Sequence, residues 1–332
     1  MAKLLLNADG KVLTSNAKVL KAPEVEDTLG QLLSNNITSY SNSSITKIST
    51  RYTFYQNTLL ESIDLPNLTD AWSSMYMFSD CTKLKLVNLP KLEKTGSYMF
   101  KGCSALESID LPNVTKMNQE TFNGCTSLKN INMPNIKDLG SFTFNGCTLL
   151  EPFNLSNIVS LGAGPFAKVK WTNFELTNLA SASIQMFQQC YDAISIKLPK
   201  LTSILMYTFS ECYSLKKIYL GYNGALIPLK NTNAFEKCYH ILGTPNDTYN
   251  PNGDKDGYIQ VPASRLANYK VATNWIEYAS QIIGHQDFNV GDTLPDYTNE
   301  TFTTQTWYSD ETLTTVVTSV ATAGKYYCRL EE

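Results

Sequence analysis

Residues 106–125 read LESIDLPNVTKMNQETFNGC, and variants of this stretch recur along the chain. In seven variants a phenylalanine is followed three residues later by a cysteine, and Phe54/Asn57 and Phe166/Val169 keep this spacing without the thiol. Successive phenylalanines of these nine units lie 21 to 26 residues apart. The pairs are Phe78/Cys81, Phe100/Cys103, Phe122/Cys125, Phe144/Cys147, Phe187/Cys190, Phe209/Cys212 and Phe235/Cys238. Repetition at such a period indicates a stack of similar small units that bury their apolar faces only against one another.

Each repeat contains the elements of one coil of a solenoid. Ile109 and Leu111 lie two residues apart, which predicts a short strand with both side chains inward. Pro112 follows directly and lacks the N–H group that would continue the strand. Gly124 precedes Cys125 and predicts a tight bend with positive φ. We therefore expect parallel pairing between the strands of successive coils.

The cysteines belong to this architecture. Seven of the 8 cysteines occupy the same repeat position. A uniform column of side chains that point the same way is poorly suited to pairwise disulfides. We expect buried free thiols that pack as small apolar groups.

The repeat resembles that of the BspA-like leucine-rich repeat family, whose units read approximately L-x-x-I-x-L-P, then an apolar position, then F-x-x-C. The resemblance covers residues from about 45 to 284. It implies a strand-dominated α/β repeat solenoid that serves as a scaffold for adhesion or partner recognition. Trp171 and Phe174 replace Leu and Ile in one coil, and Ser156 replaces a proline.

Residues 45–284 are predicted to form the solenoid, and residues 258–284 its C-terminal cap. A terminal coil needs such a cap because it would otherwise expose its core. Residues 258–262 read as the last strand, and 263–269 and 274–283 as two short helices. Trp275, Tyr278 and Ile282 or Ile283 are expected to cover the final coil, an arrangement that resembles the family's cap.

Residues 1–44 are predicted to form a separate hairpin and helix element. The segments 3–6 and 11–14 flank an Asn-Ala-Asp-Gly turn, and 23–33 reads as a short helix. This opening is similar to the short N-termini of some tailed-phage structural proteins. Residues 285–332 are rich in Thr and β-prone segments, which predicts a small β-rich module.

Composition excludes several classes of function. The net charge of −3 and the absence of a basic block argue against a nucleic-acid partner. The sequence has no apolar run of about 18 residues or more, so we expect no membrane insertion. The N-terminal apolar stretch is three leucines, which is too short for a secretory signal peptide.

No motif nominates an enzyme, a cofactor or a metal site. P-loop, dinucleotide-binding, H-E-x-x-H and C-x-x-C patterns are absent from the sequence. His240 is expected to be a partly exposed loop residue. Residues 246–257 are rich in Asn and Asp and partly resemble the start of a calcium loop, but Ala263 stands where the final acidic ligand is required. We read this segment as a polar turn.

The candidate binding surface consists of outward-facing columns. One column lies between the two inward positions of each strand, and it either forms a polar ladder or presents hydrogen-bonding groups. A second lies two residues before each phenylalanine, and a third directly follows the cysteines; such aromatic stripes suit contact with a protein or a saccharide, or lateral packing. The candidate residues are Asp64, Asn88, Asp110, Asn132, Asn154, Tyr76, Tyr98, Tyr191, Tyr213 and Tyr239.

These features predict a non-enzymatic interaction protein, and two settings fit. The first is a phage virion component, associated with the tail or capsid, that binds a host surface or a protein. The second is a secreted or cell-surface bacterial adhesin. The expected partner is a protein or a cell-surface glycan, and homo-oligomerisation or attachment to a particle is compatible with either setting. The expected location is the virion or the extracellular cell surface.

Overall fold

The chain folds into two compact units, Met1–Asn157 with Gly162–Lys170 (unit 1) and Ile158–Leu161 with Trp171–Glu332 (unit 2). The structure is a computed structural model. The structure describes residues 5–6, 12–13, 37–181, 183–221, 226–288, 294, 304–310, 313, 315–319 and 324–331.

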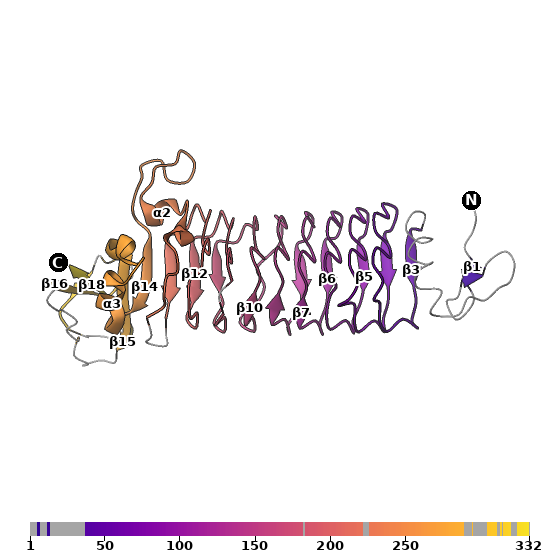
Figure 1. Ribbon diagram of the computed structural model, residues 1–332, viewed down its shortest axis with the longest axis horizontal. Coiled ribbons are helices and arrows are strands. Elements are labelled where there is room, and N and C mark those ends of the chain that lie inside the picture. The colour runs from indigo at the N-terminus through magenta and orange to yellow at the C-terminus, as the bar shows by residue number, and fades with distance from the viewer. Residues whose placement is uncertain are drawn as a thin grey trace. The chain divides into compact units, whose positions relative to one another are not determined.

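Unit 1 is built on a parallel sheet in the order β3-β4-β5-β6-β8. Its five strands have three residues each, with the central side chain turned inward, and Figure 1 shows their coils side by side. The strands are β3 (Ser39–Ser41), β4 (Ser62–Asp64), β5 (Leu86–Asn88), β6 (Ser108–Asp110) and β8 (Asn130–Asn132). The predicted parallel pairing is therefore confirmed in this unit.

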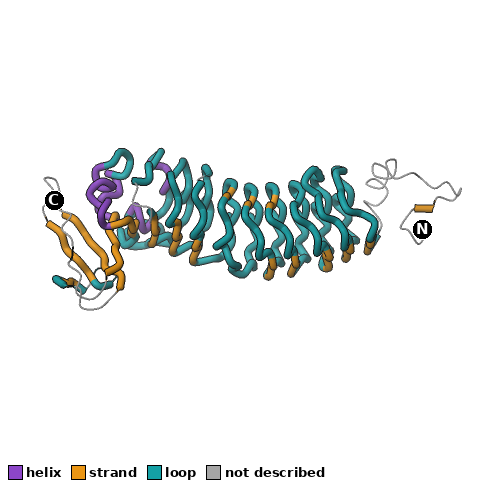
Figure 2. Tube along the Cα trace, turned by 90° about the horizontal axis from the view of Figure 1, so that it is seen from below, coloured by secondary structure: helices purple, strands orange, loops and turns teal. Residues whose placement is uncertain are grey.

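A second parallel ladder runs on another side of the same coils. It contains β7 (Lys116–Met117) and β9 (Asp138–Leu139), and single bridges extend it from Lys116 through Lys94 to Asp70. Most of each coil is loop, as Figure 2 shows. The predicted N-terminal hairpin is present as β1 (Leu5–Leu6) and β2 (Val12–Leu13), which pair antiparallel. The predicted helix over 23–33 lies outside the described residues.

The phenylalanine column forms the core of unit 1. Phe54, Phe78, Phe100, Phe122, Phe144 and Phe166 are at most 1% exposed, and successive ring centroids lie 5.2 to 6.1 Å apart. The cysteines beside them are buried and free, as predicted. Each thiol from Cys81 to Cys147 donates to the carbonyl of the phenylalanine in the preceding coil, at 3.0 or 3.1 Å. The thiols therefore link adjacent coils, which the sequence pattern does not reveal.

The predicted bend before each cysteine is also confirmed. Gly102, Gly124 and Gly146 have φ between 71° and 76°. Other coils place ordinary residues in the same left-handed conformation, among them Asp80 and Lys168 with φ of 61° and 65°. The geometry of the bend is thus kept even where glycine is absent.

Unit 2 continues the repeat with a parallel run of strands from β11 to β15. The tail strands then add antiparallel to β15, in the order β18-β16-β17. The strands of this unit are β10 (Ser160–Leu161), β11 (Asn173–Glu175), β12 (Ser195–Leu198), β13 (Lys217–Leu220), β14 (Tyr258–Pro262), β15 (Ile282–Phe288), β16 (Thr304–Tyr308), β17 (Val316–Val317) and β18 (Gly324–Glu331). The predicted division at residue 284 falls inside β15, so the tail strands share a sheet with the cap.

Short helices form the cap of unit 2. Trp275 and Tyr278 are buried against Phe235, with ring centroids 6.3 and 4.8 Å away, as the cap prediction requires. The indole N–H of Trp275 donates to the carbonyl of Ile227 at 2.8 Å. The helices are η1 (Thr232–Phe235), α2 (Tyr239–Leu242), η2 (Ala263–Arg265), α3 (Leu266–Val271) and η3 (Ile276–Gln281). The predicted fold class, a strand-dominated repeat solenoid with a helical cap, is confirmed.

Candidate interaction surfaces

The predicted polar column lies on the outward face of the unit 1 sheet. Asp64, Asn88, Asp110 and Asn132 occupy equivalent positions in the aligned strands. The amide of Asn88 donates to Asp64 at 2.8 Å, and the amide of Asn132 donates to Asp110 at 2.7 Å. Hydrogen bonds from Ser41 and Asn88 hold the pKa of Asp64 below its usual value. These side chains bond to one another, so part of their hydrogen-bonding capacity serves the sheet itself.

Asn154 does not join this column in a strand, contrary to the sequence prediction. Residues 151–155 lie outside the named strands. The Asn154 side chain instead accepts a hydrogen bond from the backbone N–H of Ser156 at 2.8 Å, which closes a local turn. Pro152 explains the difference. It occupies the position that Asn130 holds in the preceding coil, where Asn130 donates its backbone N–H. Proline has no N–H to donate, so the ladder is interrupted there.

The second column forms a row of stacked rings in unit 1. We call Tyr52, Tyr76 and Tyr98 the tyrosine row. The ring centroids of Tyr52 and Tyr76 lie 5.2 Å apart and those of Tyr76 and Tyr98 4.3 Å apart, with interplanar angles of 7° and 3°. Tyr55 packs edge-on against Tyr52 at 5.3 Å. Tyr52 is 49% exposed, so the row opens to solvent at one end.

The backbone of the tyrosine row is left-handed. Tyr52, Tyr76 and Tyr98 have φ of 62°, 56° and 60°. This conformation costs a non-glycine residue about 1–2 kcal/mol, because its Cβ crowds a carbonyl oxygen. Nothing in the sequence signals it, since tyrosine is not a residue that favours positive φ.

Polar groups frame Tyr98, the last ring of the row. The side-chain amide of Gln119 donates to its hydroxyl at 2.8 Å, and the ammonium of Lys101 lies 5.3 Å from its ring centroid. Lys101 also forms an ion pair of 2.7 Å with Glu120. Burial and the nearby Glu120 carboxylate raise the pKa of the Tyr98 hydroxyl, which therefore stays protonated at neutral pH.

The third column forms a separate tyrosine cluster in unit 2. Tyr191 stacks on Tyr213 with centroids 4.8 Å apart, and Tyr239 lies 5.4 Å from Tyr213. Tyr249, which the sequence reading missed, joins from the polar turn at 4.7 Å. The Tyr213 hydroxyl donates to Glu211 at 3.2 Å, and burial together with this carboxylate raises its pKa.

The polar turn is organised by the buried side chain of Asn250. Its amide donates to the carbonyls of Tyr239 and Asp254, at 3.1 and 2.9 Å, and its oxygen accepts from the backbone N–H of Asp254. The reading as a polar turn therefore agrees with the hydrogen bonds. Within the described residues, no group of three or more His, Cys, Asp or Glu is placed to hold a metal ion.

The prediction for His240 was wrong. His240 is 8% exposed and lies in α2, and its Nδ1 is 2.6 Å from the carboxylate of Asp256. Lys216 contacts the same carboxylate at 2.8 Å. Partial burial raises the pKa of Asp256, but the hydrogen bonds from Lys216 and His240 outweigh it and hold this pKa below its usual value. The extended chain before the cap strand brings Asp256 back onto the helix, a contact that sequence spacing does not show.

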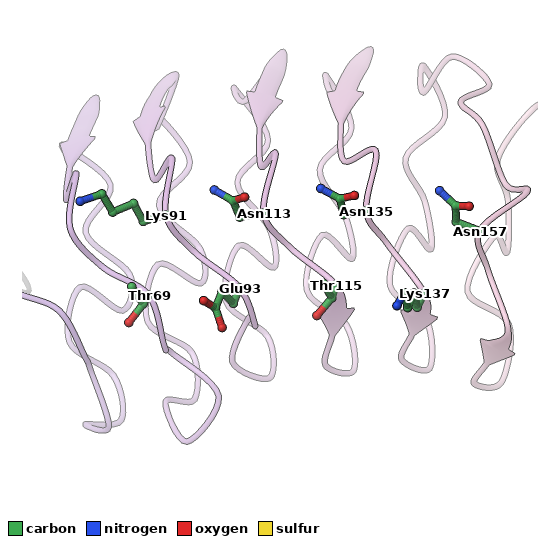
Figure 3. Close-up of a pocket in the computed structure, with 8 residues that line it drawn as sticks. All are labelled: Thr69, Lys91, Glu93, Asn113, Thr115, Asn135, Lys137 and Asn157. Carbon is green, nitrogen blue, oxygen red and sulfur yellow. The ribbon is translucent and has the colours of Figure 1, made fainter.

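A groove that the sequence reading missed runs along unit 1 between the main sheet and the β7–β9 ladder. We call it the lateral groove; it has a volume of about 660 Å³. Figure 3 shows two rows of side chains. One row comes from the residue after each proline corner, or after Ser156 in the coil of Asn157, and the other comes from two residues further on. The lining residues are Thr69, Lys91, Glu93, Asn113, Thr115, Asn135, Lys137 and Asn157. Their regular spacing along the sequence is the signal that would have revealed the groove.

Among the described helices, none combines the length and the apolar character that a membrane span requires. The longest of them has six residues. This finding concerns only the part of the chain that the structure describes.

Several solved structures are similar to this chain. A leucine-rich repeat protein from Bacteroides ovatus is 25% identical over 61% of this chain and 65% of that chain, with a TM-score of 0.38, so this chain matches only part of its length. The T. pallidum leucine-rich repeat protein is 22% identical over 48% and 74%, with a TM-score of 0.40. A leucine-rich cell surface protein from Faecalibacterium prausnitzii is 18% identical over 69% and 81%, with a TM-score of 0.32.

The repeat itself identifies the family. No curated protein matches the chain. The BspA type leucine-rich repeat region, in 6 copies, matches residues 46–157 and 115–242. Together the two matches span more than half of the chain, and they contain the Phe/Cys bends and proline corners described above. The chain therefore belongs to the BspA type leucine-rich repeat family.

Proposed function

We propose that this chain is a non-enzymatic interaction protein that binds a protein partner through the tyrosine row of unit 1. Leucine-rich repeat proteins generally act in protein interaction rather than in catalysis, and an adhesin role is compatible with the family. The observation that carries the proposal is that three tyrosines on successive coils stack in one row that is open to solvent at Tyr52. The equivalent position of other coils holds Glu120 or Gln185 in the same left-handed conformation, so the bend does not require tyrosine and the stacked rings have a use beyond it.

The arrangement of the rings favours a protein over a saccharide. Saccharides stack on open ring faces, whereas Tyr52, Tyr76 and Tyr98 stack face to face on one another. The row therefore presents ring edges and hydroxyl groups. Tyrosine in this form supplies contact area and hydrogen bonds at low conformational cost, which is typical of protein interfaces.

The outward strand column is a weaker candidate for the same role. Asp64 with Asn88, and Asp110 with Asn132, already pair within the column. A partner would have to compete with these hydrogen bonds. The column from Asp64 to Asn132 and the unit 2 tyrosine cluster stay predicted contributors to binding.

The location of the protein also stays a prediction. The Faecalibacterium prausnitzii protein is described as a cell surface protein, and we propose a cell-surface setting for this chain as well. The virion setting predicted from the sequence has no counterpart among the three structures named above. Size-exclusion chromatography with light scattering measures whether the chain forms oligomers. It therefore distinguishes binding of another protein from binding of a second copy of this chain.

The test is binding of the labelled full chain to a panel of whole bacterial cells. The triple variant Tyr52→Asn, Tyr76→Asn and Tyr98→Asn removes the rings and keeps a residue type that tolerates positive φ. Tyr207→Asn is the matched control, because Tyr207 has φ of 57° but stacks on no ring among the described residues.

We expect the triple variant to lose binding at least tenfold while the control binds normally, and we expect protease treatment of the cells to abolish this difference between the wild type and the triple variant. Unchanged binding by the triple variant would contradict the proposal. A difference that survives protease treatment but not removal of surface glycans would replace the protein partner of the tyrosine row with a saccharide.

A further inference from the structure

We propose that the lateral groove of unit 1 is a second binding site, separate from the tyrosine row, and that it takes a linear uncharged polysaccharide. The groove crosses five successive coils and is lined by amide, hydroxyl and charged side chains (Figure 3). With neighbouring strands about 4.8 Å apart, its length is about 19 Å. A binding site of that length and shape suits an extended polymer rather than a compact small molecule.

The asparagines of the groove are oriented before any ligand arrives. The side-chain amides of Asn113, Asn135 and Asn157 donate to the carbonyls of Pro90, Pro112 and Pro134, at 2.7, 2.8 and 2.9 Å. Each bond crosses to the preceding coil, so the stacking of coils fixes the amide planes. Fixed polar groups bind without a large loss of side-chain entropy.

The carbonyl side of each asparagine stays available. Within the described residues, the Oδ1 atoms of Asn113, Asn135 and Asn157 accept no hydrogen bond. A side-chain amide oxygen can accept two hydrogen bonds, so three of the five coils offer an acceptor at the equivalent position. The coil spacing of about 4.8 Å turns this into a regular row of acceptors. A polysaccharide carries hydroxyl donors at regular intervals and can satisfy such a row.

An extended peptide fits the groove less well. Peptides that add to a repeat protein as a strand need free backbone groups along an edge. Here the backbone groups beside the groove already bond between coils: the N–H groups of Thr115 and Lys137 donate to the carbonyls of Glu93 and Thr115, at 3.0 and 2.9 Å. A peptide would therefore find side-chain contacts only.

The charge of the groove favours an uncharged polymer. Its charged residues are Lys91, Glu93 and Lys137, of mixed sign. The ammonium of Lys91 donates to Asn67 at 2.8 Å and is thus already engaged. A polyanion would meet the carboxylate of Glu93, and among the lysines of the lining only Lys137 is not engaged in this way. The hydroxyl groups of an uncharged polymer can bond to every residue of the lining.

The experiment is affinity gel electrophoresis of the full chain in gels that contain hydroxyethylcellulose, laminarin, amylose or yeast mannan, with polygalacturonate as the polyanion. Thr115→Trp places a large ring in the middle of the groove. It should leave the fold intact, because the Thr115 hydroxyl makes no hydrogen bond to any residue that the structure describes and the backbone bonds of Thr115 are kept. Thr126→Trp is the matched control, at an exposed position of the same repeat away from the groove lining.

At least one uncharged polymer should retard the wild type, the Thr126→Trp variant and the Tyr98→Asn variant to the same extent. Thr115→Trp should weaken that retardation at least tenfold. The melting temperature of Thr115→Trp should equal that of the wild type. Three results would overturn the proposal: no retardation by any uncharged polymer, retardation by polygalacturonate alone, or equal retardation of Thr115→Trp and wild type. The gels contain no protein partner, so their result depends on the groove, whereas the cell-binding test depends on the tyrosine row. Failure of the groove and failure of the proposed function therefore give different results.

Discussion

Phe122 is the position where the architecture can be tested most severely. Its side chain is fully buried, and its ring stacks between Phe100 and Phe144, with centroids 5.3 and 5.6 Å away and interplanar angles of 7° and 2°. Two stacked pairs contribute roughly 1–3 kcal/mol. Truncation of a buried phenylalanine to alanine costs about 3–5 kcal/mol in total. Phe122→Ala should therefore lower the folding equilibrium constant by roughly two to three and a half orders of magnitude.

Urea unfolding followed by far-UV circular dichroism measures this change as a lower midpoint at an unchanged slope. Phe122→Leu keeps much of the volume and should lose less than the alanine variant does. Leu149→Ala is the surface control, because Leu149 is 51% exposed; its effect should stay within about 0.5 kcal/mol. A Phe122→Ala midpoint equal to that of wild type would show that the phenylalanine column does not form the core.

Four further outcomes follow from the bends, the thiols and the ion pair. Gly124→Ala should lower the free energy of unfolding by about 1–2 kcal/mol, because the φ of 76° at this position disfavours a side chain. An added Cβ would find ordinary contact distances, so no clash adds to this cost. A neutral effect in urea unfolding would contradict the left-handed bend. Lys168→Gly, at φ 65°, should be neutral or stabilising by up to about 1 kcal/mol; a loss of more than that would show that the lysine has another role. Burial raises the pKa of Cys81 and of Cys147 to about 12. These thiols in the native protein should therefore resist iodoacetamide at pH 8 until the protein unfolds. Rapid alkylation of either thiol would refute their burial. The folded pKa of Asp256 is lowered, so its contribution to stability is fully present above the unfolded pKa of about 3.9 and is lost as pH falls through the lower folded pKa. Asp256→Asn should destabilise at pH 7, and its difference from the wild type should shrink as pH falls below about 3.9. A difference independent of pH would contradict the ion pair.

The interior of each coil could be predicted from sequence because few residue types can occupy it. A buried column accepts Phe122 and Cys125, a strand end accepts Pro112, and a tight bend favours Gly124. Each of these constraints is local and recurs in every coil. The same residue types therefore reappear at a fixed interval in the sequence, which allows the positions to be recognised. The cap helix with Trp275 followed for the same reason, because a terminal coil requires an apolar cover.

The surface could be predicted only in part, because it depends on contacts between coils. An asparagine after a proline, such as Asn113, reads as an ordinary turn residue. Only the stacked coils show that its amide bonds to the preceding corner and leaves an acceptor row. The left-handed backbone of Tyr76 has no sequence signal, and the burial of His240 follows from a contact with Asp256 that lies 16 residues further along.

The central claim is that the tyrosine row binds a protein partner, and one comparison tests it most directly. Half-saturation of cell binding is measured for the wild type, for the triple variant of Tyr52, Tyr76 and Tyr98, and for Tyr207→Asn, with all three shown to be folded by far-UV circular dichroism. The account predicts a shift of at least tenfold for the triple variant, no shift for Tyr207→Asn, and no difference between the wild type and the triple variant after protease treatment of the cells. Equal half-saturation for the triple variant and the wild type would contradict it.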